Sequence, residues 1–484
     1  MSCEGKKNRL FLTLEEAGVF LIDCIHKTPD YKIDGFPYVG IPQLNNGRIN
    51  LSDSKKISLE DFEEWTKKVI PKTYDVVLSR RCNPGETAYV QEGQLFALGQ
   101  NLVILRVDGH LIFPSFFRWL VKGNEWWGQV NKFLNVGAIF NSLKISDILK
   151  FELAIPPLEE QGKIAKILGD LDDKIELNNQ INKTLEEMAH ALFKSWFVDF
   201  DPVKAKISAD KKWKEEHGEQ LTPSQKEEHS DFLRNAAMSI ISGKSENELS
   251  EFEKSNPEKY KELADTADLF PATLEESPLG PIPSGWEVGK LSDLINFNPP
   301  RFLKKGTNAP YLDMKNVPTI GHLANEVICR EMNSGTKFIN GDTLLARITP
   351  CLENGKTAFV DFLKENEVGW GSTEYIVLRP LKNISPSIGY FIARNESFRN
   401  FAIQSMTGTS GRQRANSNAL SDLEWIKYPI EILNVFAMFA DKYLLAAKEK
   451  GFENKVLAQT RDTLLPRLLS GEIDLSSTGV ESII

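Results

Sequence analysis

The chain has 484 residues, a net charge of −9, and 41% hydrophobic and 26% charged residues, an ordinary composition for a folded protein of several domains. No apolar run is long enough to span a membrane, which excludes an integral membrane protein. The five cysteines and six histidines are dispersed without metal-ligand spacing, so we expect a cytoplasmic protein with free thiols and no metal site.

Six segments are predicted along the chain. They are a mixed α/β domain at 1–155, a long helix at 156–200, an acidic linker or insertion at 201–284, a second mixed domain at 285–429, a second long helix at 430–475, and a tail at 476–484. Apolar, β-branched runs predict strands at 75–79, 102–107, 342–348 and 375–380. Helices are expected to begin at Pro114 and at Pro386, because proline suits the first helical position.

The segment 201–280 contains 11 basic and 18 acidic residues and carries most of the net charge. We expect an exposed helix or a mobile linker there. Since the rest of the chain is close to neutral, the net charge does not exclude a basic face that binds nucleic acid.

The two halves of the chain resemble each other at a period of roughly 270 residues, which indicates domain duplication. The run "YDVVLSRR" at 74–81 corresponds to "GDTLLARI" at 341–348, and "LVILR" at 102–106 corresponds to "YIVLR" at 375–379. Each half ends in a long helix, the second of which is expected to stay helical until Pro466.

The first long helix has an apolar seam whose spacing alternates between four and three residues, the pattern of a coiled coil. Its predicted interface residues are Ile164, Leu168, Leu171, Ile175, Asn178, Asn182, Leu185 and Leu192, with Leu457 and Leu464 in the second helix. The two helices can bury these seams against each other. The alternative is that each helix packs only on its own domain.

Two catalytic motifs can be tested against the sequence. "NPPR" at 298–301 resembles the Asn-Pro-Pro-aromatic signature of DNA adenine-N6 methyltransferases, but Arg301 replaces the aromatic ring and no Gly-rich loop for S-adenosylmethionine is present. Asp30, Asp53 and Lys55 loosely match a nuclease metal site, a match expected by chance among 67 acidic residues. We therefore interpret 298–301 as a turn and predict no catalytic residue and no bound cofactor.

Binding chemistry is repeated in both halves, since arginine follows an equivalent strand in each. Arginine reads guanine with two hydrogen bonds and also binds phosphate. The predicted DNA-binding residues are Arg80, Arg81, Asn83, Lys304, Lys305, Lys315, Arg347, Thr349, Lys356, Arg412, Gln413, Arg414 and Asn416. The loop "GTSGRQRAN" at 408–416 is charged, whereas "NVGAIFNS" at 135–142 is not, so the two domains are expected to read different sequences.

Three stretches carry a family resemblance. The run 154–206, which contains "LEEQGKIAKILGDLDDKIELNNQINKTLEEMAHALFKSWF", closely resembles the central conserved region of the specificity (S) subunit of type I restriction-modification enzymes. Residues 269–294 resemble that family's entry into the second target recognition domain, and 464–475 resemble its distal conserved helix.

The resemblance implies an α+β fold with two target recognition domains separated by two long antiparallel coiled-coil helices. It implies binding to a bipartite, asymmetric double-stranded DNA target. It also implies docking of two methyltransferase (M) subunits and of restriction (R) subunits, with S-adenosylmethionine, ATP and Mg²⁺ held by those partners. The alternatives from other classes are a self-sufficient adenine methyltransferase or nuclease, and a coiled-coil scaffold that binds no DNA.

Overall fold

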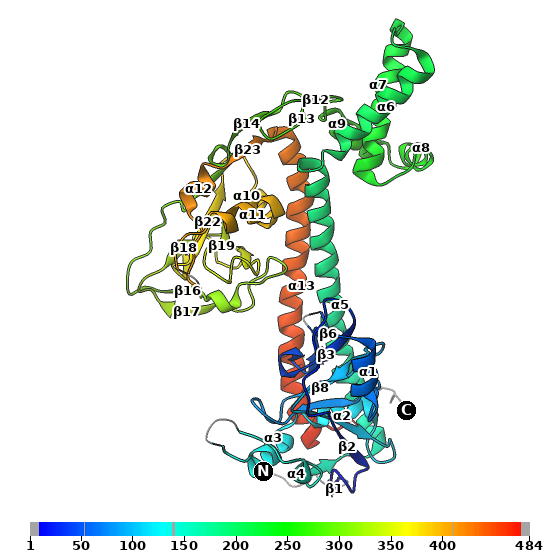
Figure 1. The fold of residues 1–484 in the computed structure, drawn as a ribbon, viewed down its shortest axis with the longest axis vertical. Coiled ribbons are helices and arrows are strands. Elements are labelled where there is room, and N and C mark those ends of the chain that lie inside the picture. The colour runs from blue at the N-terminus through cyan, green and yellow to red at the C-terminus, as the bar shows by residue number, and fades with distance from the viewer. Residues whose placement is uncertain (1–8, 53, 138–140, 410, 476–484) are drawn as a thin grey trace. The chain divides into compact units, whose positions relative to one another are not determined.

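A computed structural model of the chain describes residues 9–52, 54–137, 141–409 and 411–475. The chain divides into two compact units, which are drawn in Figure 1. Unit 1 comprises residues 1–177 and 453–484, and unit 2 comprises residues 178–452. The predicted tail at 476–484 and the thiol of Cys3 lie outside the described residues.

Unit 1 is built on a six-stranded sheet. In spatial order its strands are β2 (Val19–Asp23), β10 (Leu102–Val107), β7 (Val76–Ser79), β8 (Thr87–Tyr89), β5 (Arg48–Ile49) and β4 (Leu44–Asn45). A three-stranded sheet follows the order β6 (Lys55–Ile57), β3 (Phe36–Val39) and β9 (Ala97–Leu98), and β1 (Leu10–Thr13) pairs with β11 (Glu152–Ile155). The helices are α1 (Leu59–Thr66), α2 (Pro114–Leu120), α3 (Asn124–Phe133) and α4 (Ile145–Ile148), with a 3₁₀ turn, η2, at Ile41–Gln43.

Unit 2 contains two four-stranded sheets. One follows the order β15 (Ile295–Phe297), β22 (Tyr375–Pro380), β19 (Thr343–Ala346) and β20 (Thr357–Phe359), and the other β17 (Ile328–Glu331), β16 (Asn308–Leu312), β21 (Gly369–Gly371) and β18 (Thr336–Phe338). The pairs β12 (Leu274–Glu275) with β13 (Ile282–Pro283) and β14 (Glu287–Lys290) with β23 (Glu424–Lys427) complete the strands. The sheets are accompanied by α10 (Pro386–Arg394), α11 (Glu396–Gln404) and α12 (Ser417–Ser421), and by the 3₁₀ turns η3 (Leu291–Asp293) and η4 (Met314–Asn316).

The same strand pairing occurs in both units, which confirms the predicted duplication. The antiparallel pairs β2–β10, β7–β10 and β7–β8 correspond to β15–β22, β19–β22 and β19–β20, and the parallel pair β3–β9 corresponds to β16–β21. The four predicted strands and the helix starts at Pro114 and Pro386 are all confirmed. The observed fold class is the predicted mixed α and β one.

The central strand of each unit is apolar throughout because both of its faces are buried. Side chains alternate between the two faces of a strand, so a strand covered on both faces needs no polar positions. On β10, Val103 and Leu105 enter one core cluster while Leu102 and Ile104 enter another. On β22, Ile376 and Leu378 are likewise separated from Tyr375 and Val377.

Two long helices, α5 (Leu158–Phe197) and α13 (Ile430–Ser470), contribute to both units. In unit 2 the ring centroids of Phe193 on α5 and Phe436 on α13 lie 5.5 Å apart, and Asn182 Nδ2 donates to the carbonyl of Ala447 over 3.2 Å. Asn182 of α5 contacts Ala447 of α13, and Phe193 contacts Phe436, so residue numbers rise along one helix as they fall along the other. The two helices therefore pack antiparallel, as predicted.

The expectation that the second helix stays helical only until Pro466 was wrong, since α13 continues to Ser470, within the predicted segment 430–475. Proline inside a helix removes one hydrogen bond and costs about 3 kcal/mol. Here the turn around it packs Leu464, Leu465, Leu468 and Leu469 into the core of unit 1. That apolar burial offsets the lost hydrogen bond.

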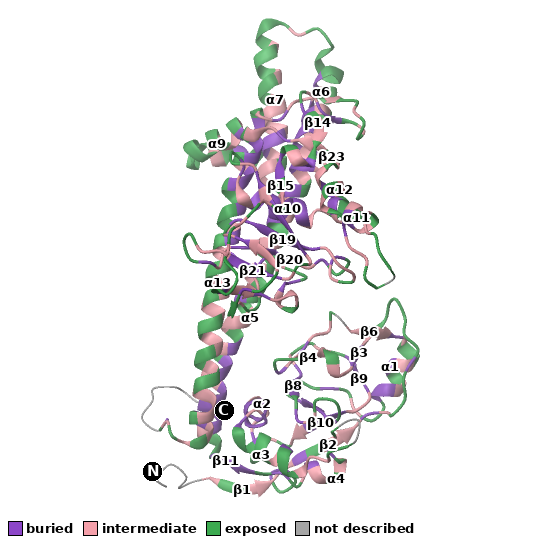
Figure 2. Ribbon diagram, turned by 90° about the vertical axis from the view of Figure 1, so that its left-hand side faces the viewer, coloured by how far each residue is buried: buried purple, intermediate pink, exposed green. Residues whose placement is uncertain are grey.

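The acidic segment folds into four helices rather than a linker without structure. These are α6 (Asp201–His217), α7 (Pro223–Ser242), α8 (Glu246–Ser255) and α9 (Pro257–Asp268). Helices α7, α8 and α9 share a small core formed by Ala237, Met238, Leu249 and Ala267, and α6 packs on α7 through the rings of Trp213 and Phe232. Figure 2 shows how much of α7 and α9 remains exposed, which explains the polar composition of the segment.

Candidate nucleic-acid interface

In unit 1 the predicted arginine turn follows β7. Arg80 is only 9% exposed, and its guanidinium lies 3.8 Å from Asp23 Oδ1, so this side chain belongs to the domain interior. Arg81 and Asn83 are exposed on either side of Cys82, whose φ of 63° turns the chain sharply. Of the three predicted residues in this turn, Arg81 and Asn83 are therefore the two that a ligand can reach.

In unit 2 the equivalent turn follows β19 and packs against the loop at 407–416. The backbone carbonyl of Arg347 accepts a hydrogen bond from the amide of Ala415 over 2.8 Å. Thr349 Oγ1 donates to the carbonyl of Gln413 over 3.3 Å. Arg347, Thr349 and Gln413 are half-buried, so the structure brings these three predicted residues together.

Two further predicted residues of unit 2 hold its loops in place. Lys356 Nζ donates to the carbonyl of Met314 over 2.7 Å, which ties the turn after β19 to η4. Arg414 forms a bidentate pair with Glu374, with N–O distances of 2.7 to 2.9 Å. The same pair raises the pKa of Arg414, so this guanidinium is charged and already matched.

The remaining predicted residues of unit 2 are exposed. Arg412 and Asn416 lie on the loop at 407–416, where the Asn416 side chain also caps α12. Lys315 lies on η4, next to the carbonyl that Lys356 binds. Lys304 and Lys305 follow β15 on a separate loop. These five side chains are the accessible polar groups among the unit 2 predictions.

The pairing of the recognition loops is also duplicated. Isolated β-bridges join Arg81 and Asn135 to Ser142 in unit 1, and Ile348 and Thr407 to Arg414 in unit 2. The loop at 135–142 therefore corresponds to the loop at 407–416, although residues 138–140 and 410 lie outside the described residues. Whether these loops contact DNA remains a prediction.

The ten residues predicted for the helix seam are all buried or half-buried. Ile164, Leu168 and Asn178 are buried, and Leu171, Ile175, Asn182, Leu185, Leu192, Leu457 and Leu464 are half-buried. None of the ten is exposed, which agrees with a helix pair that buries a heptad stripe.

Comparisons with known proteins give matches to one kind of protein. The family model for the type I restriction modification DNA specificity domain matches residues 14–187. The specificity subunit of the type I restriction enzyme HindI from Haemophilus influenzae is 28% identical over 446 residues, covering 89% of this chain and 92% of the relative. Residues 14–187 therefore match a type I DNA specificity domain, and the chain is similar to a type I specificity subunit along most of its length.

One further relative matches a smaller part of the chain, and one solved structure aligns with most of it. The specificity subunit of the type I restriction enzyme MjaIX from Methanocaldococcus jannaschii is 31% identical over 150 residues, covering 31% of this chain and 34% of that protein. The crystal structure of an S subunit from M. genitalium aligns with 97% of this chain and 98% of its own, at a TM-score of 0.46 and 13% identity.

Specificity subunits are the non-catalytic DNA-recognition components of their systems, in agreement with the prediction that this chain is not an enzyme. The Arg301 of the "NPPR" stretch has a structural task, since its guanidinium donates to the buried carboxylate of Asp342 over 3.0 Å. Among the described residues, no helix is long and apolar enough to cross a membrane.

Sequence reasoning missed a buried ion cluster in unit 1. Asp172 on α5 is 5% exposed and accepts hydrogen bonds from Arg48 on β5, Arg118 on α2 and Arg461 on α13, over 2.8, 3.2 and 2.8 Å. Burial alone would raise the pKa of Asp172, but the three guanidinium groups hold it below its usual value. Burial lowers the pKa of the nearby Lys122 to about 8. The cluster joins the first domain to both long helices, and no local pattern signals it.

A second ion cluster joins α5 to the second domain inside unit 2. Glu186 on α5 accepts hydrogen bonds from His190, over 3.0 Å, and from Tyr390 on α10, and its Oε2 lies 3.8 Å from His322 Nδ1. The other ring nitrogen of His322, which is 1% exposed, lies 3.7 Å from Asp361. Burial alone would lower the pKa of His322, but the two carboxylates raise it above its usual value. For Glu186, burial would raise the pKa, but its three partners hold it well below its usual value.

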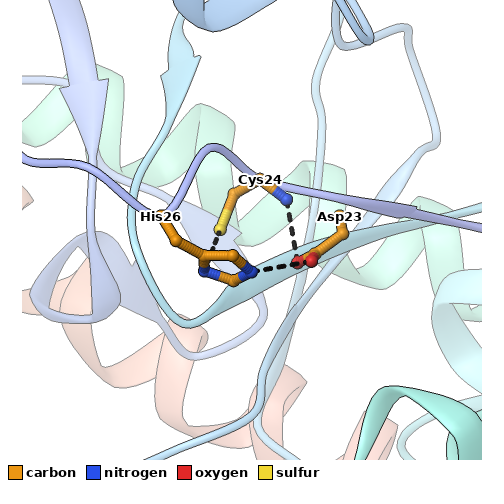
Figure 3. A group of neighbouring side chains, drawn as sticks. All are labelled: Asp23, Cys24 and His26. Carbon is orange, nitrogen blue, oxygen red and sulfur yellow. Dashed lines mark hydrogen bonds and ion pairs between the residues drawn. The ribbon is translucent and has the colours of Figure 1, made fainter.

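A third group, Asp23, Cys24 and His26, is shown in Figure 3. His26 Nε2 lies 2.8 Å from Asp23 Oδ2, and His26 Nδ1 lies 3.8 Å from Cys24 Sγ. Burial and the Asp23 charge raise the pKa of the Cys24 thiol, which disfavours the thiolate that a metal or a nucleophilic reaction requires. The three groups satisfy one another, and we assign them no metal.

Proposed function

We propose that this chain reads a bipartite, asymmetric DNA sequence for a type I restriction-modification complex, with unit 1 contacting one half-site and unit 2 the other. The observation that carries the proposal is one strand arrangement used twice with different loop chemistry. Arg81 and Asn83 are offered by unit 1, whereas unit 2 offers Arg412 and Asn416. Two different reading surfaces on one scaffold suit two different half-sites.

The proposed recognition domains are residues 1–155 and 285–429, with long helices at 156–200 and 430–475 and a helical insertion at 201–284. The exposed lysines and arginines would bind phosphates and fix the register, and side chains at base edges would supply specificity. Arg80, Lys356 and Arg414 have partners within the protein. We therefore assign them the task of shaping the loops.

We further propose that the long helices dock two methyltransferase subunits, with restriction subunits joining the assembly. An exposed apolar stripe on α13 supports this: Met438, Leu445 and Phe452 are 61%, 56% and 70% exposed and follow one another at seven-residue intervals. That spacing suits the packing of another helix. S-adenosylmethionine, ATP and Mg²⁺ would be bound by those partners in the cytoplasm, with no cofactor on this chain.

A matched heptad deletion tests the proposal. Removing residues 178–184 from α5 and 445–451 from α13 shortens both helices by opposed segments, because Asn182 contacts Ala447. Seven residues correspond to about 10 Å of helix, or about three base pairs. A randomised-spacer library methylated by the reconstituted complex should therefore shift its preferred spacer by about three base pairs. An unchanged spacer preference in an assembled, active complex would contradict the proposal that the helices set the spacing.

A further inference from the structure

An equivalent loop in each unit joins two equivalent strands. In unit 1 it connects β2 to β3, and in unit 2 it connects β15 to β16. The strands that follow occupy the same place in their sheets, because Tyr38 pairs in parallel with Ala97 as Tyr311 does with Trp370. The two loops are therefore copies of one another, at 24–35 and 298–307.

Each loop presents one strongly exposed apolar side chain. Ile33 is 95% exposed and Phe302 is 86% exposed, the two highest values for any large hydrophobic side chain in the described part of the chain. Moving a large apolar side chain out of water lowers the free energy, so such a residue on the equivalent loop of both copies marks a contact surface.

Both neighbours of Phe302 are anchored. On one side Arg301 donates to Asp342, which is fully buried and also accepts from Arg379 over 3.2 Å. On the other side Leu303 packs into the cluster that contains Trp370. The loop is fixed where it meets the domain, and between these two anchored neighbours the Phe302 side chain faces solvent. A ligand would bind this side chain with little loss of conformational entropy.

Different contacts hold the loop around Ile33 against its domain. The amide of Lys32 donates to the carbonyl of Lys56 over 2.8 Å. Gly35 has a φ of 140°, and a Cβ there would lie 2.1 Å from the carbonyl oxygen of Ile57, so the chain passes close to β6.

Cations and aromatic rings surround both tips. In unit 1 Lys55 Nζ lies 3.9 Å from the ring centroid of Tyr31. In unit 2 the Arg330 guanidinium lies 5.0 Å from the ring centroid of Tyr311, and Lys304 and Lys305 are exposed beside Phe302. In unit 1 the exposed Asp34 follows Ile33, and its carboxylate pairs with Lys56 over 3.4 Å. An apolar tip beside cations suits a polyanion with an apolar interior, which is the character of a DNA groove.

We propose that Phe302 and Ile33 contact bases of their respective half-sites and determine specificity there. This inference rests on the proposed function. Lys304, Lys305 and Lys32 would hold the adjacent phosphates, while the apolar tip meets a thymine methyl group or a base step. Because one copy carries an aromatic ring and the other a β-branched chain, the same loop would favour different bases in the two half-sites.

The test uses the complex reconstituted with its methyltransferase subunits and a duplex library randomised over both half-sites. Phe302→Ala should reduce the preference at one or two adjacent positions of one half-site by about ten-fold and leave the other half-site unchanged. Ile33→Ala should do the reverse. Ile240→Ala on α7, a side chain 47% exposed, is the matched control and should alter neither. Thermal melting of each variant should be unchanged, because no buried contact is removed.

The outcomes separate the two proposals. A wild-type complex that selects no bipartite sequence overturns the proposed function. A wild-type complex that selects one, with preferences unchanged in both variants or weakened equally in both half-sites, overturns this inference alone. For a half-site that contains thymine, replacing that base with uracil distinguishes the two contacts. If uracil weakens DNA binding by the wild-type complex but not by the alanine variant, the side chain contacts the methyl group. If uracil does not weaken binding by the wild-type complex, the side chain contacts the base step.

Discussion

Replacing Asp172 by alanine tests the ion cluster that joins the first domain to both long helices. The substitution removes one carboxylate that accepts from three arginines and leaves Arg48, Arg118 and Arg461 close together without it. Breaking a buried ion pair from one side costs about 3–5 kcal/mol, because the remaining charge stays desolvated. Asp170→Ala is the matched control, since this exposed neighbour pairs with Lys166 in a contact worth about 0.3–0.5 kcal/mol.

Hydrogen exchange measured by mass spectrometry resolves where stability is lost. The free energy of hydrogen exchange should fall in the peptides of unit 1 that carry β5, α2 and the first half of α5. The fall should reach the full value of about 3–5 kcal/mol where these peptides exchange by unfolding. The Asp172→Asn variant adds a pH test. Because the pKa of Asp172 is lowered in the folded protein, its charge contributes stability above the unfolded value of about 4, and that contribution is lost as the pH falls below it. The stability gap between wild type and Asp172→Asn should therefore narrow below about pH 4.

The reasoning would be refuted if Asp172→Ala were no less stable than Asp170→Ala. Equal protection in both variants would mean that the three arginines do not depend on this carboxylate.

Three further predictions concern unit 2. His322→Gln should lower the free energy of unfolding in urea more at pH 6 than at pH 9. The raised pKa makes the charged histidine stabilising below about pH 6.5, and that contribution disappears as the pH rises through the pKa of the folded state. A loss of stability that does not depend on pH would contradict this. Arg412→Ala should weaken DNA binding without lowering the melting temperature, whereas Arg414→Ala should lower the melting temperature through loss of its bidentate partner, and identical behaviour of the two would argue against their different roles. Phe452→Asp should abolish co-purification with the methyltransferase subunit while the isolated chain keeps its circular dichroism spectrum, and an unimpaired complex would exclude the α13 stripe as the docking surface.

The strands and helix starts could be predicted because their signals are local. The run 102–107 is apolar at every position since β10 is covered on both faces, and Pro386 sits at the first position of α10. The duplication could also be predicted, because the offset between the copies drifts by only a few residues. Pro466 misled the prediction, since a local rule was overridden by the packing of the four leucines around it.

The roles of individual arginines could not be predicted from the sequence. Arg80 and Arg81 are adjacent, yet one is buried beside Asp23 and the other is exposed. Arg414 looks as available as Arg412 until Glu374, forty residues away along the chain, is brought to it. Phe302 escaped notice because an exposed apolar side chain has no signature before the fold places its neighbours.

Single-molecule methylome sequencing of the native host, with and without this gene, tests the central claim most directly. The account predicts that N6-methyladenine disappears from one bipartite motif with a fixed spacer and that re-expression of the chain restores it. An unchanged methylome in a host that expresses the methyltransferase subunits would contradict the claim that this chain selects the methylated sequence.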